Sequence, residues 1–229
     1  MPEQRLGHAA VPELSLTANT YLTGDSLVRS GFILRDRARS FANLVIERFH
    51  VKTPNAEKAA GSLSGGNLQK FIMGREILNR PRVLLVHQPT WGVDVGAAAV
   101  IRNSLIRLRD DGAAIIVVSE EIDELFEISD RIAVMYLGRI VEIAEKNELY
   151  NNPQHPYTKA LLDTVPGIYD ESGRTLASIP GIVPENYDQI PGCRFADRCA
   201  FAGEGCEKKQ EMREIEKDHF VRCHKADRS

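Results

Sequence analysis

Ser62-Leu63-Ser64-Gly65-Gly66-Asn67-Leu68-Gln69-Lys70 begins the stretch of sequence that decides the fold, and this stretch continues to Asp94. Within it, Ser64 and two glycines precede a helical pattern. Glycine lets an anion approach the backbone closely, and the first amide N–H groups of a helix have no partner inside the helix. Ser64 is in a position to cap this helix and to offer its hydroxyl to a phosphate. The segment therefore predicts a phosphate-binding helix start.

The downstream sequence separates this prediction from an ordinary turn, which would be enough to explain Ser-Gly-Gly alone. Val83-Leu84-Leu85-Val86 has the pattern of a short buried strand. It leads into His87-Gln88-Pro89-Thr90 and then into Gly92-Val93-Asp94. A strand and a Gln-Pro-Thr…Asp segment at this distance favour a nucleotide site over a turn.

This combination resembles the ATP-binding-cassette (ABC) ATPases. Leu63 to Gln69 resembles their signature motif, Val83 to Gln88 their Walker B strand, and Gly92 to Asp94 their D-loop. The resemblance implies that the signature contacts an ATP held by the opposite subunit of a head-to-tail dimer. The residues that it implies for this interface are Ser64, Gly65, Gly66, Asn67, Gln69 and Asp94.

A complete ABC ATPase also needs a P-loop, G-x-x-x-x-G-K-[ST], whose amides and lysine hold the phosphates. No such string occurs in the 229 residues. We therefore expect an α/β fold: a partial P-loop NTPase (ABC ATPase) domain that lacks the Walker A portion and has an open sheet edge. A small irregular extension that contains the cysteines follows it.

Three further positions depart from the family. Its Walker B strand ends in Asp-Glu, with one carboxylate in the Mg²⁺ shell and one that polarises the attacking water, whereas this chain has His87 and Gln88. Imidazole is a poor ligand for Mg²⁺, and glutamine cannot take a proton from water at neutral pH. Glu120 replaces the switch histidine. We expect no ATP hydrolysis by this chain's own groups. For His87, a structural role at the edge of the core is as good an explanation as a functional role.

The resemblance implies two kinds of partner. A second ABC ATPase subunit bearing a P-loop would hold ATP and Mg²⁺, and transporter membrane subunits would bind the helical part. The net charge of −3 without a basic stripe argues against nucleic acid as a partner. No apolar run is long enough to span a membrane, and the first residues lack a signal-peptide core. We expect a peripheral protein on the cytoplasmic face of the plasma membrane.

The hydrophobic pattern predicts strands that alternate with helices, and hence an α/β sheet that is largely parallel. Successive apolar positions in the first strand predict that helices cover both of its faces. The predicted helices are 35–50, 64–79, 97–110, 121–128 and a short one ending near 165. The predicted strands are 82–87, 115–118, 131–137 and 139–144.

The character of the sequence changes near Lys146. We expect an ABC ATPase fragment over 1–145, with part of the helical subdomain at 1–61 and the signature-to-switch region at 62–145. Residues 146–229 would form the extension.

Two family resemblances disagree about the substrate. The tail resembles the C-terminal extension of oligopeptide and dipeptide importer ATPases at His155-Pro156-Tyr157-Thr158, Ile179-Pro180-Gly181 and Gly192-Cys193-Arg194-Phe195. The front, from Gln88 to Ala97, resembles the second ATPase half of sugar or nucleoside importers.

All four cysteines, Cys193, Cys199, Cys206 and Cys223, lie in the extension. A cytoplasmic setting argues against structural disulfides, and the C-x₂₋₄-C pairs of most zinc sites are absent. Four thiolates suit an iron–sulfur cluster, and the peptide-importer tail can carry a [4Fe–4S] cluster. Zinc and free thiols stay open as alternatives. His219 and His224 are spare ligand candidates, which we expect at the surface.

The sequence thus predicts an ATP-binding subunit, or part of one, of an ABC importer. It would couple ATP binding and hydrolysis in a dimer to the uptake of peptide, nucleoside or sugar. Whether the chain is itself an enzyme stays open, because its own catalytic positions are altered. The alternative is a non-catalytic interaction or redox module with a metal-bound cysteine tail.

Overall fold

The computed structural model describes residues 6–164 and 178–226. The chain divides into two compact units, Met1–Ile128 and Ser129–Ser229. The sequence predicts a different boundary, near residue 146, where the resemblance changes from an ABC ATPase to the C-terminal extension. That boundary stays a prediction. Part of the Pro/Gly-rich loop expected before Gly192 lies outside the described residues.

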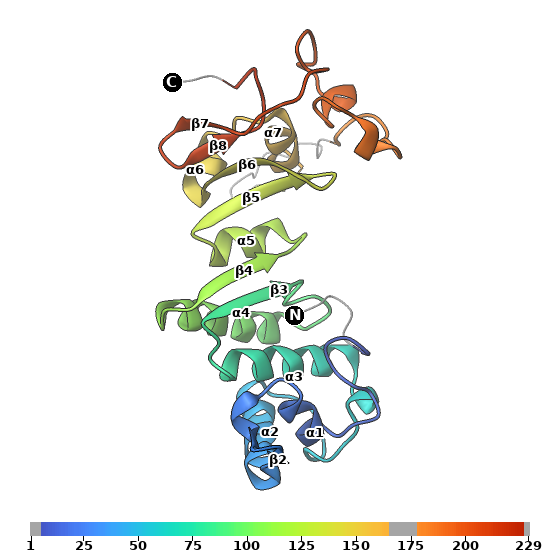
Figure 1. The fold of residues 1–229 in the computed structure, drawn as a ribbon, viewed down its shortest axis with the longest axis vertical. Helices are drawn as coiled ribbons and strands as arrows, with labels where there is room; N and C mark the ends of the chain where they lie inside the picture. The colour runs from blue at the N-terminus through green and yellow to red at the C-terminus, as the bar shows by residue number, and fades with distance from the viewer. Residues whose placement is uncertain (1–5, 165–177, 227–229) are drawn as a thin grey trace. The chain divides into compact units, whose positions relative to one another are not determined.

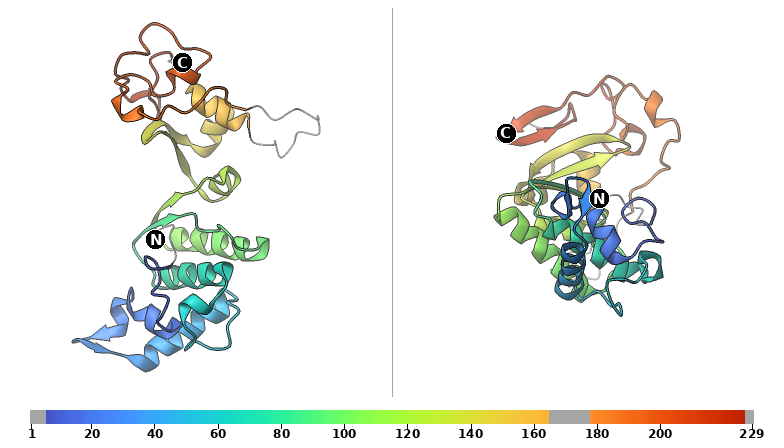
Figure 2. Two further views of the ribbon diagram at one scale, coloured as in Figure 1. Left: turned by 90° about the vertical axis from the view of Figure 1, so that its right-hand side faces the viewer. Right: turned by 60° about the horizontal axis from the view of Figure 1, so that its bottom comes forward.

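The first unit combines a helical part with a two-stranded parallel sheet (Figure 1). Helices α3 and α4 lie side by side, and a small hairpin, β1–β2, projects from the helical part (Figure 2). The helices are α1 (Leu16–Tyr21), α2 (Arg35–Arg48), α3 (Gly65–Leu78), α4 (Val95–Asp110) and α5 (Ile122–Ile128). The strands are β1 (Val28–Arg29), β2 (Phe32–Ile33), β3 (Val83–His87) and β4 (Ala114–Val118). Short 3₁₀ turns occur at Asp25–Leu27 and Ala60–Ser62.

Helix α3 is the centre of the first unit's core. All residues from Leu68 to Arg75 are buried, because α2 packs on one side of this helix and α4 on the other. A helix covered on several sides is apolar around most of its circumference, as Phe71, Ile72 and Met73 show. The start of α3 is therefore held on a rigid element.

Arg75 is a charged residue inside this core, with 2% of its side chain exposed. Its guanidinium donates to the carbonyl oxygens of Ala9 (2.8 Å) and Asn19 (2.9 Å), and it pairs with Glu76 (2.6 Å). A buried charge is tolerated when it is paired and its donors are satisfied. Arg75 thereby fastens α1 and the segment before it to α3.

The second unit is built on a four-stranded antiparallel sheet with the order β5-β6-β8-β7. Leu137 and Gly138 join β5 to β6 and both have positive φ, as a two-residue type I′ turn requires. The strands are β5 (Arg131–Tyr136), β6 (Arg139–Glu145), β7 (Arg213–Glu216) and β8 (His219–Val221). The helices are α6 (Lys146–Asn151) and α7 (Pro156–Leu162), with 3₁₀ turns at Tyr187–Gln189 and Ala196–Arg198.

An aromatic cluster forms the core beside this sheet. The Tyr136 ring lies 4.6 Å from the ring of Tyr157 and 5.2 Å from that of Phe195, measured between centroids. These rings join β5, α7 and the cysteine-containing segment. The segment that carries the cysteines is therefore packed on the sheet through Phe195.

The structure confirms the predicted helices and strands to within a few residues, but it corrects two expectations about the sheet. Among the described strands only β3 and β4 are parallel. The larger sheet is antiparallel because β7 and β8, which the sequence prediction missed, join the β5–β6 hairpin. Helices do not cover both faces of β3: Leu84 and Val86 are buried, whereas Val83 and Leu85 are 66% and 54% exposed.

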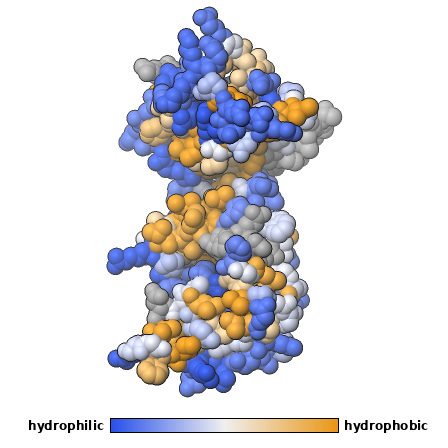
Figure 3. Space-filling model, turned by 45° about the vertical axis from the view of Figure 1, so that its right-hand side comes forward, coloured by the Kyte–Doolittle hydropathy of each residue, from blue (hydrophilic) through white to orange (hydrophobic). Residues whose placement is uncertain are grey.

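The small sheet is exposed at its face, and its pairing also bears on the molecule's surface. Among the described strands, β3 and β4 pair only with each other, and the open sheet edge stays a prediction. Apolar side chains gather in patches on the face shown in Figure 3.

Candidate nucleotide and metal sites

The signature segment lies at the beginning of α3, with Ser64 and Gly65 exposed to solvent. Ser64 has the backbone conformation of an N-cap, but its hydroxyl makes no capping hydrogen bond. It accepts instead from the Asn67 side-chain amide (2.9 Å), so the expectation that Ser64 caps the helix is wrong. The Asn67 side-chain oxygen in turn accepts from the backbone N–H of Lys52 (2.8 Å). The helix start is thus shaped by side-chain contacts that leave its first amides without a side-chain cap.

Gly66 brings the signature segment against the D-loop-like segment. A Cβ atom added to Gly66 would lie 2.9 Å from the carbonyl oxygen of Gly92, closer than real Cβ contacts allow. A glycine is therefore required at this position for the two segments to touch. Next to this contact, the carboxylate of Asp94 caps α4 by accepting from the N–H of Ala97 (2.9 Å), and this hydrogen bond lowers the pKa of Asp94.

Gln69 lies on the same helix but is buried, with 1% exposed. Its side-chain amide donates to the carbonyl oxygens of Gln88 (3.1 Å) and Pro89 (2.8 Å). It therefore ties the signature helix to the turn that follows β3. Of the six residues implied for the interface, Ser64, Gly65, Gly66, Asn67 and Asp94 reach the surface or lie half-buried, whereas Gln69 acts from inside.

The altered catalytic positions lie at the carboxyl ends of β3 and β4. His87, half-buried, pairs in register with Val118, and Glu120 is exposed. Gln88 is 9% exposed and has a positive φ of 50°, and its N–H donates to the carbonyl oxygen of Val118 (2.7 Å). This strained turn fixes Gln88 at the place where strand β3 ends.

Sequence reasoning missed two residues of this region, Ser119 and Glu124. The Ser119 hydroxyl lies 3.3 Å from the side-chain oxygen of Gln88 and 2.9 Å from a carboxylate oxygen of Glu124. Glu124 is 4% exposed, and its other carboxylate oxygen has no hydrogen-bond partner among the described residues. Helical spacing could have found it, because Glu124 shares the buried face of α5 with Ile128.

The four cysteines line one small pocket in the second unit. Its lining includes Cys193, Cys199, Cys206 and Cys223, together with His155 and Phe195. Gly192 makes this convergence possible, because a Cβ there would collide with the carbonyl oxygen of Cys206. The Cys193 N–H donates to that same carbonyl (2.8 Å). Residues far apart in the sequence are thereby brought to one cavity.

Burial raises the pKa values of the Cys193 and Cys199 thiols, and the neighbouring cysteines raise them further. These thiols are therefore not activated nucleophiles. The structure places no disulfide among the four cysteines.

His155 adds a polar group to the wall of this pocket. Its Nδ1 accepts from the N–H of Tyr157 (3.0 Å) and so caps α7. Burial lowers the pKa of His155 to about 4, so the ring is neutral at pH 7 with its proton on Nε2. That nitrogen is buried and has no hydrogen-bond partner in the described part of the chain.

The two spare histidines differ from each other. His224 is exposed, as expected, and its Nδ1 lies 3.0 Å from the side-chain oxygen of Gln210. The surface position expected for His219 is wrong, because its side chain is 1% exposed and its Nε2 lies 2.8 Å from Glu142. Glu142 is itself fully buried and holds the histidine in the interior.

Solved structures of ABC proteins share this fold. A dimeric ATP-binding cassette in a post-hydrolysis state, bound to ADP and phosphate, aligns with a TM-score of 0.53 over 62% of this chain and 61% of that chain, at 22% identity. An ATP-binding subunit of an ABC transporter aligns with the same TM-score over 65% and 58%, at 17% identity. The fold is therefore that of part of an ABC ATPase domain, with mixed α/β structure.

Curated relatives point to one branch of this class. A putative peptide import ATP-binding protein of Brucella melitensis is 37% identical over 162 residues, which are 70% of this chain and 48% of that protein. A second putative peptide import ATP-binding protein, from Brucella abortus, is 33% identical over 217 residues, which are 90% of this chain and 64% of that protein. The probable D,D-dipeptide transport ATP-binding protein of Escherichia coli is 31% identical over 189 residues, which are 82% of this chain and 61% of that protein. The chain spans about half to two thirds of the length of these relatives.

A family model described as the oligopeptide/dipeptide transporter C-terminal region matches residues 141–206. Together these findings confirm the resemblance to the ATP-binding subunits of ABC transporters. More particularly, the chain is similar to peptide import ATP-binding proteins and has a C-terminal region of the peptide-importer type.

Proposed function

We propose that this chain acts as an ATP-binding subunit, or part of one, of an ABC importer, and that its signature segment completes an ATP site whose P-loop a second subunit provides. The observation that carries the proposal is the exposed, side-chain-uncapped start of α3 at Ser64 and Gly65. Free amides at a helix N-terminus favour a phosphate group. The contact of Gly66 with Gly92 would hold the D-loop-like segment, with Asp94, at the same interface.

The proposed site depends on ATP and Mg²⁺ bound by the second subunit. No P-loop string occurs in this sequence, and His87, Gln88 and Glu120 occupy the positions of the family's catalytic groups. In the part of the chain that the structure describes, no set of three His, Cys, Asp or Glu ligand atoms gathers at the ends of β3 and β4. Hydrolysis would accordingly take place at the site that this chain completes.

Peptide is the substrate class that we propose for the transporter. The C-terminal family match and the similarity to peptide and dipeptide import proteins of Brucella and Escherichia coli support peptide over sugar or nucleoside. The cargo itself would bind elsewhere in the transporter.

We propose that the helical part of the first unit binds the transporter's membrane subunits at the cytoplasmic face of the membrane. The β1–β2 hairpin exposes apolar side chains, with Phe32 at 77% and Ile33 at 41%. Exposed apolar patches commonly mark protein interfaces. None of the helices in residues 6–164 and 178–226 has the length and apolar character needed to cross a membrane.

We propose that the cysteine pocket holds an iron–sulfur cluster and not a single zinc ion. All four thiols line one cavity, but no three of them come within 4.8 Å of one another in the described residues, whereas the ligands of one ion must. A [4Fe–4S] cluster binds each thiolate through a different iron, so it needs wider spacing. The buried, unpartnered Nε2–H of His155 on the same wall is a donor suited to a cluster sulfur. When bound, the cluster would supply a metal crosslink and a one-electron centre.

We expect the purified chain to bind Mg-ATP only weakly, with a Kd in the high micromolar range or weaker. The reason is that it has no P-loop lysine and no P-loop amides to hold the phosphates. Isothermal titration calorimetry measures this directly, with a P-loop-bearing ABC ATPase subunit as the positive control. Low-micromolar binding by this chain alone would contradict the proposal.

The two candidate functions differ in one measurement. An importer subunit should support ATP hydrolysis when it is combined with a P-loop-bearing partner, and neither protein alone should reach that rate. A purely non-catalytic redox or interaction module would leave the partner's rate unchanged.

A further inference from the structure

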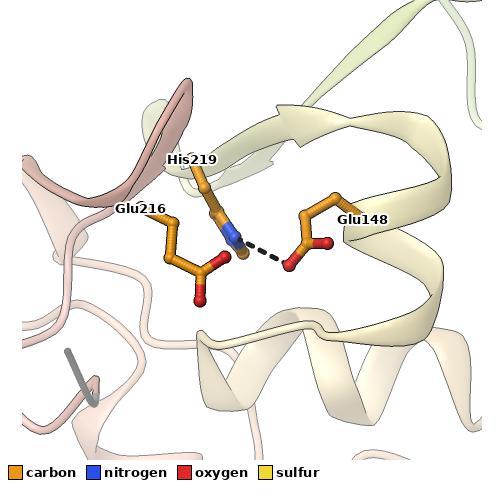
Figure 4. A group of neighbouring side chains, drawn as sticks. All are labelled: Glu148, Glu216 and His219. Carbon is orange, nitrogen blue, oxygen red and sulfur yellow. Dashed lines mark ion pairs between the residues drawn. The ribbon is translucent and has the colours of Figure 1, made fainter. Parts of the chain in front are cut away.

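A second polar cluster in the second unit lies apart from the cysteine pocket. It contains His219 and the carboxylates of Glu148 and Glu216 (Figure 4). One ligand atom from each residue lies within 4.8 Å of the other two. In Figure 4 the two carboxylates approach the imidazole from different sides, one from α6 and one from β7.

The local structure explains why these three residues meet. Glu216 ends β7 and His219 begins β8, and the two form a directly opposed pair across the hairpin. Opposed residues of an antiparallel pair project their side chains to the same face. Asp218 has a positive φ of 61°, which lets a two-residue turn join the strands. Glu148 reaches the same place from α6, which packs on β6.

The position of the His219 ring is fixed on one side by Glu142. That carboxylate is fully buried and already accepts from the backbone N–H groups of Gln154 (2.7 Å) and His155 (2.9 Å). It is also 2.8 Å from His219 Nε2. An ionised carboxylate only accepts hydrogen bonds, so Nε2 must be the donor.

The other ring nitrogen, Nδ1, is buried and has no hydrogen-bond partner among the described residues. It lies 3.5 Å from an oxygen of Glu148, too far for a good hydrogen bond. In a neutral ring Nδ1 carries a lone pair, and here that lone pair faces carboxylate oxygens. A positive charge between Nδ1 and the carboxylates, from a proton on Nδ1 or from a metal ion, would balance these acceptors.

We propose that Glu148, Glu216 and His219 form a binding site for a divalent transition-metal cation of the Mn²⁺ or Zn²⁺ class. One imidazole nitrogen and two carboxylate oxygens are ligands that such cations accept. Glu142 would be the outer carboxylate that orients the liganding histidine, an arrangement common to metal-bound histidines. Glu148 and Glu216 are half-buried, which leaves solvent a path for entry and for water ligands. The bound ion would join α6 to the β7–β8 hairpin.

Mn²⁺ is the probe that separates this site from the cysteines, because it prefers oxygen and nitrogen ligands to thiolates. In the full chain we expect one Mn²⁺ per chain, measured by electron paramagnetic resonance titration of the free ion. Glu148→Gln and Glu216→Gln keep the size of each side chain but remove its charge. Each should raise the Kd by at least about tenfold.

Glu214→Gln is the matched control. Glu214 lies on the same strand, and its carboxylate accepts from the N–H of Asp218 (3.0 Å), which a glutamine oxygen can also do. It should bind Mn²⁺ as the wild type does, and circular dichroism should show that all three variants are folded. Absence of Mn²⁺ binding in the wild type would overturn the proposal. Binding of Mn²⁺ by both glutamine variants with the wild-type Kd would overturn it too. So would Mn²⁺ binding that is lost only when the cysteines are alkylated.

Discussion

Ser64→Arg should abolish the ATP hydrolysis that this chain stimulates in a complex with a P-loop-bearing subunit. Ser64 is exposed at the start of α3, where the proposed γ-phosphate contact needs space and free amide groups. An arginine there would fill the space, although its charge is compatible with phosphate. Removing one preorganised donor from a phosphate or oxyanion site typically costs about 10²–10³ in rate, and a steric block should cost at least as much. The measurement is steady-state phosphate release by the reconstituted complex.

Gln88→Ala is the matched control for this experiment. Gln88 occupies the Walker B position of the chain's own altered site, and the substitution keeps the backbone carbonyl that accepts from Gln69. The rate should change little, because the working site would be the one completed by Ser64. Gel filtration should confirm that both variants still form the complex. If Gln88→Ala were as damaging as Ser64→Arg, the proposal would have assigned activity to the wrong site.

The elements around the signature were predictable because their causes are local. Helix α3 follows a Ser-Gly-Gly start and an apolar pattern, and β3 is a short apolar run after Pro81. The turn at Leu137 and Gly138 likewise carries its own signal, since two adjacent positive φ angles favour a glycine. Each of these depends on neighbours in the sequence.

The β7–β8 hairpin and the burial of His219 were not predictable in this way. The hairpin residues 213–221 have no strong alternation of apolar and polar side chains. Their place is set by pairing with β6, where Glu142 lies opposite Val221, about 80 residues later in the chain. His219 is buried because Glu142 accepts its hydrogen bond, a contact between distant residues that no local pattern reveals. The exposed face of β3 has the same origin, because burial depends on what packs there and not on the strand's own composition.

The candidate site also combines features that a local motif predicts with features that depend on contacts in space. A motif locates the signature positions, which remain proposed site residues. It does not reveal the role of Gln69, because the Gln69 amide donates to the carbonyl oxygens of Gln88 and Pro89. Likewise, the Ser64 hydroxyl, which the sequence assigns to helix capping, accepts a hydrogen bond from the Asn67 side-chain amide instead. In both cases a competing partner close in space decides what the side chain does.

Replacing any one of Cys193, Cys199, Cys206 or Cys223 by serine should remove the proposed cluster completely. Protein purified without oxygen should be brown and contain about four irons per chain, and the serine variants should be colourless. The loss should also loosen residues 180–224, since few apolar side chains there are buried (Phe195 and Val221) and the region would depend on the metal as a crosslink. Iron analysis, visible absorption and limited proteolysis would measure these effects.

The first unit should remain folded in these variants, because its core cluster is made only of residues from Ala9 to Ile128. Its helices should therefore persist in the far-ultraviolet circular dichroism spectrum. His224→Gln is the control for the cluster, since His224 lines the same pocket but is not one of the proposed ligands. That variant should stay brown, because four thiolates already supply one ligand to each iron. Colourless anaerobic wild type with one zinc per chain that the serine variants lose would replace the cluster by a zinc site. Colourless protein with four titratable thiols and no metal would remove the crosslink from the second unit altogether.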